Sequence, residues 1–157
     1  MADMNTLLQA LRDGIADATA IKTWCTTNYT RNHTVYVGLD QENPPDDDAY
    51  PIVSLYPISK GAGNSEEEKK HVFGVMLGIY DTALATGGKT NVVEYKGVQN
   101  IEAFRKLVAA AISAALTTVR ITDVAIAYEA LELFPYFLCE QQFTAVEDTE
   151  FGDDLLE

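Results

Sequence analysis

Basic residues are scarce in this sequence. Its 157 residues include 11 lysines and arginines against 24 aspartates and glutamates, which gives a formal net charge of −13. Nucleic-acid affinity comes mainly from lysine and arginine displacing the counterions of phosphates, so this balance argues against a chain that grips DNA or RNA. An anionic membrane surface also attracts basic segments, and the same deficit argues against docking there.

Long apolar runs are missing too. The longest one, residues 107–116, is interrupted by Ser113, and it falls far short of the roughly 20 apolar residues that a membrane span needs. Residues 1–10 lack both the basic start and the apolar stretch of a secretory signal. We therefore expect no transmembrane helix and a cytoplasmic location.

Cysteine and histidine are few and widely spaced. Cys25 and Cys139 match no short metal-binding spacing, and we expect both to be reduced and buried, with a catalytic thiol or a disulfide as the alternatives. His33 and His71 each begin a predicted strand without a second ligand at metal spacing, and we interpret them as strand-edge residues. The sequence thus predicts no metal, no cofactor and no catalytic residue.

Two short strings resemble binding motifs without completing them. Gly-Lys-Thr at 88–90 ends the phosphate-binding loop of P-loop enzymes, but this chain has Ala83 where that pattern needs glycine, and a strand-like segment follows instead of a helix. We interpret it as a flexible hairpin loop. Three aspartates at 46–48 lack the alternating ligands of a calcium loop. We interpret them as a solvated acidic loop, with weak Ca²⁺ or Mg²⁺ binding as the alternative.

Helical periodicity is clearest at the start and in the second half of the chain. Apolar residues at 7, 8, 11, 15 and 18 form one stripe, with Asp3 or Asn5 as the expected cap. Gly14 weakens the middle of this helix, and Asp17 is expected to cap a second short turn. Asn100 is expected to cap a longer helix over residues 101–117. Its buried stripe comprises Phe104, Leu107, Val108, Ala111, Ile112, Ala115 and Leu116.

Alternation of apolar and other residues predicts the strands. They cover residues 34–39, 50–57, 71–80, 92–96, 121–131 and 136–148, the last two forming a hairpin. Prolines at the ends of 50–57 indicate a short strand or edge positions. Gly74 and Gly78 on one face of 71–80 suggest close approach by a helix. Polar loops are expected at residues 40–49, 59–70 and 81–91.

This order of elements predicts an α+β fold. A mainly antiparallel sheet is covered by an N-terminal helix and by a long helix before a C-terminal β-hairpin. Residues 1–148 form one domain, and residues 149–157 form an acidic C-terminal tail. From Glu147 onward the chain carries six acids and no base, so we expect this end to be disordered or loosely tethered.

The chain resembles the tail terminator (tail completion) proteins of long-tailed bacteriophages over roughly residues 5–148. The resemblance rests on the order of the following segments and on their patterns of residue types: Leu7-Leu8-Gln9-Ala10-Leu11, residues 34–39, Tyr50-Pro51-Ile52-Val53-Ser54-Leu55, residues 100–117, Phe134-Pro135-Tyr136-Phe137 and Gln142-Phe143-Thr144-Ala145-Val146-Glu147. It implies a phage or prophage structural protein that is not an enzyme and needs no cofactor.

The resemblance also implies partners and a location. Such proteins form a hexameric ring on the last ring of tail tube protein, stop its polymerisation and present a surface to the head-tail connector protein. They assemble in the host cytoplasm and end in the virion tail, where DNA passes through without being specifically bound. The acidic balance fits a channel that repels DNA. The alternatives are another head-tail connector or tail tube protein, or a small enzyme.

Two of the polar loops are candidates for contacts with the tube or with a neighbouring subunit. The candidate residues are Ser59, Lys60, Glu66, Lys69, Lys70, Thr86 and Lys89.

Overall fold

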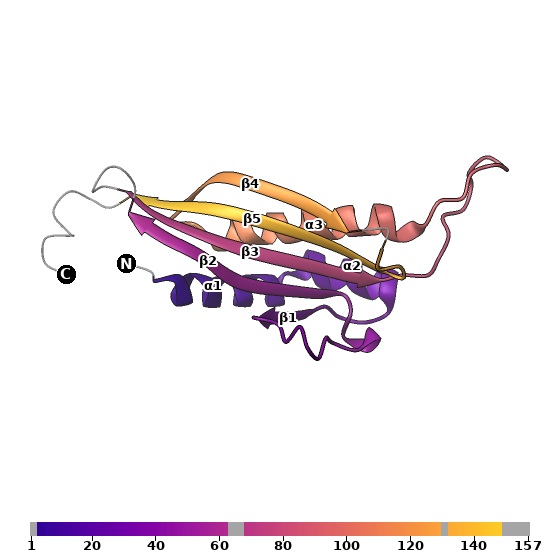
Figure 1. Ribbon diagram of the computed structural model, residues 1–157, viewed down its shortest axis with the longest axis horizontal. Helices are drawn as coiled ribbons and strands as arrows, with labels where there is room; N and C mark the ends of the chain where they lie inside the picture. Colours follow the sequence, from indigo (N-terminus) through magenta and orange to yellow (C-terminus); the bar gives the residue numbers. More distant parts are fainter. Residues whose placement is uncertain (1–2, 63–67, 130–131, 149–157) are drawn as a thin grey trace, which may run out of the picture.

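A five-stranded sheet carries α-helices on one face (Figure 1). The computed structural model describes residues 3–62, 68–129 and 132–148. Within these residues the elements are α1 (Met4–Asp17), α2 (Thr19–Tyr29), β1 (Thr34–Val37), the 3-10 turn η1 (Asp47–Ala49), β2 (Ile52–Ala62), β3 (Glu68–Tyr80), α3 (Lys96–Ala115), β4 (Arg120–Glu129) and β5 (Tyr136–Asp148).

The strand order is β1-β2-β3-β5-β4. β1 runs parallel to β2, and every other pair of neighbours is antiparallel. The predicted α+β class, the mainly antiparallel sheet and the terminal hairpin are therefore confirmed. β3 and β5 pair along their full lengths, from Glu68 opposite Asp148 to Tyr80 opposite Tyr136.

The core lies between the helices and one face of the sheet. From β3 it takes Phe73, Val75, Leu77 and Ile79, all without solvent exposure. The predicted stripe of α3 is buried at Phe104, Val108 and Ile112, and partly buried at Leu107, Ala111 and Ala115. Two stacked ring pairs lie within the layers, one between α2 and α3 and one between β3 and β5. They are Trp24 on Phe104, with ring centroids 5.5 Å apart, and Phe73 on Phe143, at 5.3 Å.

α1 continues through Gly14 and ends at Asp17. Asp3 is its N-cap, accepting a hydrogen bond from the Thr6 amide at 2.7 Å, as predicted. Asp17 does not cap α2, because Ala18 occupies that position without a side-chain cap. Gly14 instead lets α3 approach, since a Cβ at this position would lie 2.8 Å from the Cβ of Ala115.

Aromatic side chains, and not a helix, cover the two glycines of β3, so that prediction is wrong. A Cβ at Gly74 would lie 2.2 Å from the ring of Tyr56, and one at Gly78 would lie 2.8 Å from the ring of Tyr50. The helices pack on the opposite face of the sheet, where the larger apolar side chains of β3 offer more surface to bury.

The expected loop at 59–70 is largely strand. β2 runs on to Ala62 and β3 begins at Glu68, because the two strands supply each other's hydrogen bonds beyond a register shift between Pro57 and Ser59. β2 is therefore longer than predicted. Its pairing with β1 ends at Leu55, so Pro57 lies on a free edge, where its missing amide hydrogen costs no ladder bond.

The region before α3 also differs from the prediction. Residues 92–96 form no strand. Leu84 and Tyr95 make one isolated bridge, and α3 begins at Lys96 with Tyr95 as its N-cap. Asn100 lies inside the helix and does not cap it. β5 ends at Asp148, as predicted for the strand over residues 136–148, and residues 149–157 lie outside the described residues.

Candidate interaction surfaces

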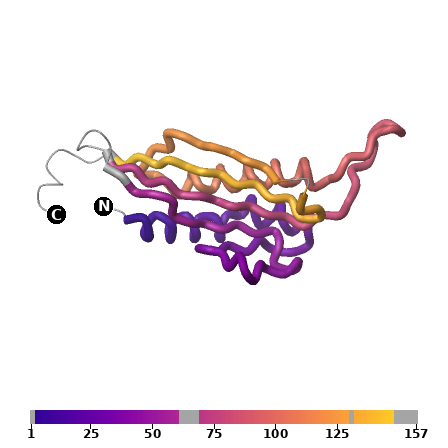
Figure 2. The backbone as a smooth tube through the Cα atoms, in the orientation of Figure 1, coloured from indigo at the N-terminus to yellow at the C-terminus, as the bar shows by residue number. Residues whose placement is uncertain are grey.

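Residues 82–95, which we call the arm, project from one end of the molecule (Figures 1 and 2). The base of the arm is a narrow pair of extended segments. The Ala85 amide donates to the Glu94 carbonyl at 2.8 Å, and the Lys96 amide donates to the Ala83 carbonyl at 3.0 Å. Near the tip, the Val92 amide donates to the Lys89 carbonyl at 3.0 Å. The arm is therefore ordered by its own backbone bonds.

A buried carboxylate fixes the base of the arm. Asp81, 7% exposed, accepts from the Tyr29 hydroxyl at 2.8 Å and from the Ala83 amide at 2.9 Å. The Asn100 side-chain amide donates to the Tyr29 hydroxyl at 2.9 Å. Burial, together with the hydrogen bond to Asp81, raises the pKa of Tyr29. The last turn of α2, the end of β3 and the start of α3 thus meet where the arm begins.

Apolar side chains on the arm face solvent. Val93 is 71% exposed, Leu84 53% and Val92 51%. Tyr95 is also exposed, although its ring lies 4.9 Å from that of Phe134 in the turn before β5. Branched side chains this exposed on a projecting segment are typical of a surface that a partner covers.

β4 is an edge strand with one open side. Ile121 is half-buried and its other nine residues are exposed. Val124, Ile126 and Tyr128 stand opposite Phe143, Gln141 and Cys139 of β5. These three apolar side chains therefore share the helix-bearing face of the sheet, but each remains 42–47% exposed.

Residues 124–129 of this edge lack the usual protection against strand pairing. Natural edge strands are blunted by lysine, proline or a bulge. β4 has an irregularity between Ile121 and Asp123, whereas residues 124–129 contain no lysine and no proline. Six residues of backbone are therefore available to pair with another segment.

One hydrogen bond joins the end of β4 to α3. The Tyr128 hydroxyl donates to the Glu102 carboxylate, which also accepts from Arg105 Nε of the same helix at 2.9 Å. The hydrogen bond from Arg105, followed by the one from Tyr128, lowers the pKa of Glu102 to about 2. Glu102 is therefore ionised at neutral pH, and it anchors this end of the strand.

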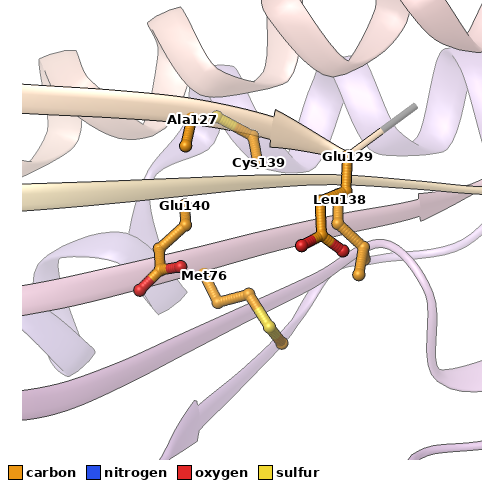
Figure 3. Close-up of a pocket in the computed structure, with 6 residues that line it drawn as sticks. All are labelled: Met76, Ala127, Glu129, Leu138, Cys139 and Glu140. Carbon is orange, nitrogen blue, oxygen red and sulfur yellow. The ribbon is translucent and has the colours of Figure 1, made fainter. Parts of the chain in front are cut away.

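The helix-free face of the sheet has a hollow beside β4. Figure 3 shows its lining residues, which come from β3, β4 and β5. They are Met76, Ala127, Glu129, Leu138, Cys139 and Glu140. Its volume is about 90 Å³, below the several hundred Å³ typical of a small-molecule site. A wider hollow of about 400 Å³ adjoins it through Met76 and Glu140, under the β1–β2 connection.

The structure separates the sequence-predicted contact residues into two groups. Ser59 and Lys60 lie near the free end of β2, opposite Val72 and His71, and Lys69 and Lys70 pair with residues 62 and 61. These four belong to strands, which corrects their placement in a loop. Glu66 lies outside the described residues. Thr86 and Lys89 form the second group and are exposed on the arm, at the far end of β3.

The histidines and cysteines are interior residues. His33 is 8% exposed, with Nε2 2.8 Å from the Ile15 carbonyl oxygen, and His71 is 1% exposed within β3, so the strand-edge interpretation is wrong. Cys25 and Cys139 are buried and free, as expected. Burial raises their pKa values to about 12 and about 11, respectively.

Two further features bear on the sequence expectations. Within the described part of the chain, His, Cys, Asp and Glu form no group that could hold a metal ion. Among the helices of that part, none combines the length and apolar composition needed to cross a bilayer.

Sequence reasoning missed the exposed face of β4, because a strand rich in valine, isoleucine and alanine is typical of a buried one. It also missed the hydrogen bonds that fix the base of the arm. The polar residues Asp81 and Asn100, one on each side of an expected loop, could have indicated them. In the comparisons with known proteins, no protein-family model and no curated protein matches the chain.

Proposed function

We propose that this protein is a phage or prophage tail terminator, a structural subunit that forms a ring, caps the tail tube and joins it to the head-side connector. The observation that carries the proposal is the unprotected edge of β4 together with the exposed apolar arm. Both are surfaces that a partner protein would cover, and they occur on an α+β subunit with the element order typical of that family.

Head-to-tail contacts between copies fit this arrangement. The arm and β4 are two different surfaces of one chain, and a contact between unlike surfaces propagates from copy to copy until it closes into a ring or extends as a filament. A contact between like surfaces would stop at two copies. A tail terminator requires the closed ring.

The charge of the chain also supports the proposal. Each copy contributes a formal charge of −13, so a ring of six would surround its channel with a strongly negative field. DNA passing through such a channel is repelled from the wall. A ring whose lumen was lined with lysine and arginine would contradict this part of the argument.

The main alternative is a tail tube or head-tail connector subunit, which shares small size and ring assembly. Electron microscopy of the purified protein separates a terminator from a tube subunit. We expect closed single rings, whereas open-ended tubes would identify a tube protein. With the tail tube protein of the same phage, the terminator should also hold tubes at fixed length by binding their ends.

A further inference from the structure

We propose that the arm of one copy adds to the open edge of β4 in a second copy of this chain. This inference rests on the proposed function, since it assigns the contact between neighbouring subunits of the ring. It concerns a segment and a strand that lie in different parts of the fold, and it predicts which side chains each copy contributes.

The exposed apolar residues of the described chain are concentrated in these two places. On the arm and beside it they are Leu84, Val92, Val93, Tyr95, Val98, Leu133 and Phe134. On β4 they are Val124, Ile126 and Tyr128. Covering both groups in one contact removes most of this apolar surface from water, which favours association.

The backbone of the arm suits an edge strand as its partner. Residues 90–95 have the β-branched and aromatic composition of a strand, yet their backbone bonds are the isolated bridge at Tyr95, the bonds of the base and the one from the Val92 amide to the Lys89 carbonyl. β4 offers the complementary row of unpaired groups along residues 124–129. Strand addition would satisfy both sets of donors and acceptors.

Charge complementarity favours a second copy over an unrelated apolar strand. Lys89 is the single charged residue in the distal part of the arm, residues 85–93, and it is basic in a chain with a net charge of −13, whereas the exposed Glu94 carries the opposite charge at the base. The end of β4 presents the exposed carboxylates of Glu129 and, on the adjoining strand, Glu140 (Figure 3). Lys89 from a neighbour meets opposite charge there, which offsets part of the repulsion between two acidic subunits.

Two matched variants test the contact. Val93→Asp alters the arm at a 71% exposed position, and Ile126→Asp alters β4 at a 42% exposed position. Val37→Asp, at a 44% exposed position of β1, is the control. Circular dichroism and thermal unfolding establish that each variant folds, and sedimentation measures mass against protein concentration. We expect Val93→Asp and Ile126→Asp to weaken self-association at least about tenfold, and Val37→Asp to leave it unchanged.

Mixing the two variants gives the sharper result. The Val93→Asp copy retains an intact β4, and the Ile126→Asp copy retains an intact arm, so the pair can make one contact and no second. We expect a one-to-one complex at twice the 17.2 kDa chain mass, although each variant alone stays monomeric. A mixture that stays monomeric would overturn the proposal, as would normal assembly by either variant.

If Ile126→Asp fails to fold, Ile126→Lys replaces it, because lysine is a common protective residue on exposed strand edges. The failure of this contact is distinguishable from failure of the ring. A wild-type ring of six that tolerates both variants refutes the arm contact and leaves the terminator proposal standing. Arm-dependent association that ends in open filaments refutes the terminator and supports the contact. A wild-type chain that never associates refutes the contact.

Discussion

Asp81 illustrates how one buried side chain determines the geometry of a distant surface. Its carboxylate binds the Tyr29 hydroxyl and the Ala83 amide, and its own amide donates to the Pro135 carbonyl at 3.0 Å. The arm therefore leaves the body from a point held by α2, β3 and the turn before β5. A partner meets an arm with a defined origin, which reduces the conformational entropy lost on binding.

Asp81→Ala should destabilise the protein by about 1–3 kcal/mol, because it leaves the Tyr29 hydroxyl and the Ala83 amide without their acceptor in a partly buried setting. Urea denaturation followed by circular dichroism measures the effect. Asp13→Ala is the matched control. Asp13 pairs with Arg12 at the surface, where its side chain is 64% exposed, and it should change stability by less than about 0.5 kcal/mol. Equal effects of the two variants would refute the role assigned to Asp81.

His71 links stability to pH. Burial and then the charge of Lys60 lower its pKa below the usual 6.5, against the opposing effect of Glu147, whose Oε2 lies 3.9 Å from Nε2. The folded state thus holds a neutral imidazole, whereas the unfolded state takes up a proton as the pH falls through about 6.5. This contribution to stability is present at neutral pH and is lost on acidification.

The free energy of unfolding of the wild type should therefore fall between about pH 7 and about pH 5. His71→Leu removes the titrating group and should show a smaller fall over the same range. Urea titrations at several pH values measure both slopes. Identical slopes in the two proteins would show that His71 does not carry the pH dependence.

At the scale of elements, the contact between α1 and α3 depends on a glycine. Gly14→Ala raises helix propensity by about 1 kcal/mol, but the new methyl group meets the Cβ of Ala115 at 2.8 Å. Overpacking costs typically about 1–3 kcal/mol, so we expect a net loss of stability. Gly14→Ala combined with Ala115→Gly should recover part of that loss. A single variant more stable than the wild type would contradict the close packing of these helices.

Hydrophobic periodicity predicted the elements that bury one continuous apolar stripe, which are α1, α3, β3 and β5. In each of them the apolar residues recur at the spacing of a helix or a strand, so the local sequence and the packing indicate the same structure. β2 was predicted too short because proline ends a strand only where a neighbouring strand needs its amide hydrogen, and the pairing of β2 with β1 has already ended at Leu55. The strand at 92–96 was predicted in error because its β-branched and aromatic residues suit a strand, but the described chain supplies no neighbouring strand for them.

The candidate surfaces were harder to predict than the fold. Polar or charged groups typical of loops occur at Ser59, Lys60, Lys69 and Lys70. These residues are nevertheless part of strands, because the pairing of β2 with β3 that begins at Ile52 and Gly78 continues through them. The exposure of Val124 and Ile126 depends on where the helices stop across the sheet, which is a tertiary property. Thr86 and Lys89 were predicted as contact residues on an expected loop, and both are exposed on the arm.

In the whole molecule, each acidic subunit carries an unprotected sheet edge and an arm. The proposed contact between the arm of one copy and the edge of the next joins the copies into one ring. Acidic copies repel one another at long range, so the ring has to be held by short-range contacts between apolar surfaces and by local pairing of opposite charges. The arm and β4 offer both. The helix layer borders the proposed contact through the hydrogen bond between Tyr128 of β4 and Glu102 of α3.

Native mass spectrometry of the wild-type protein over a range of concentrations measures whether the copies close into a ring. We expect a closed assembly of six copies of the 17.2 kDa chain, with no growth beyond it as the concentration rises. A largest species of one or two copies at every concentration, or a continuous series of masses that never closes, would contradict the ring.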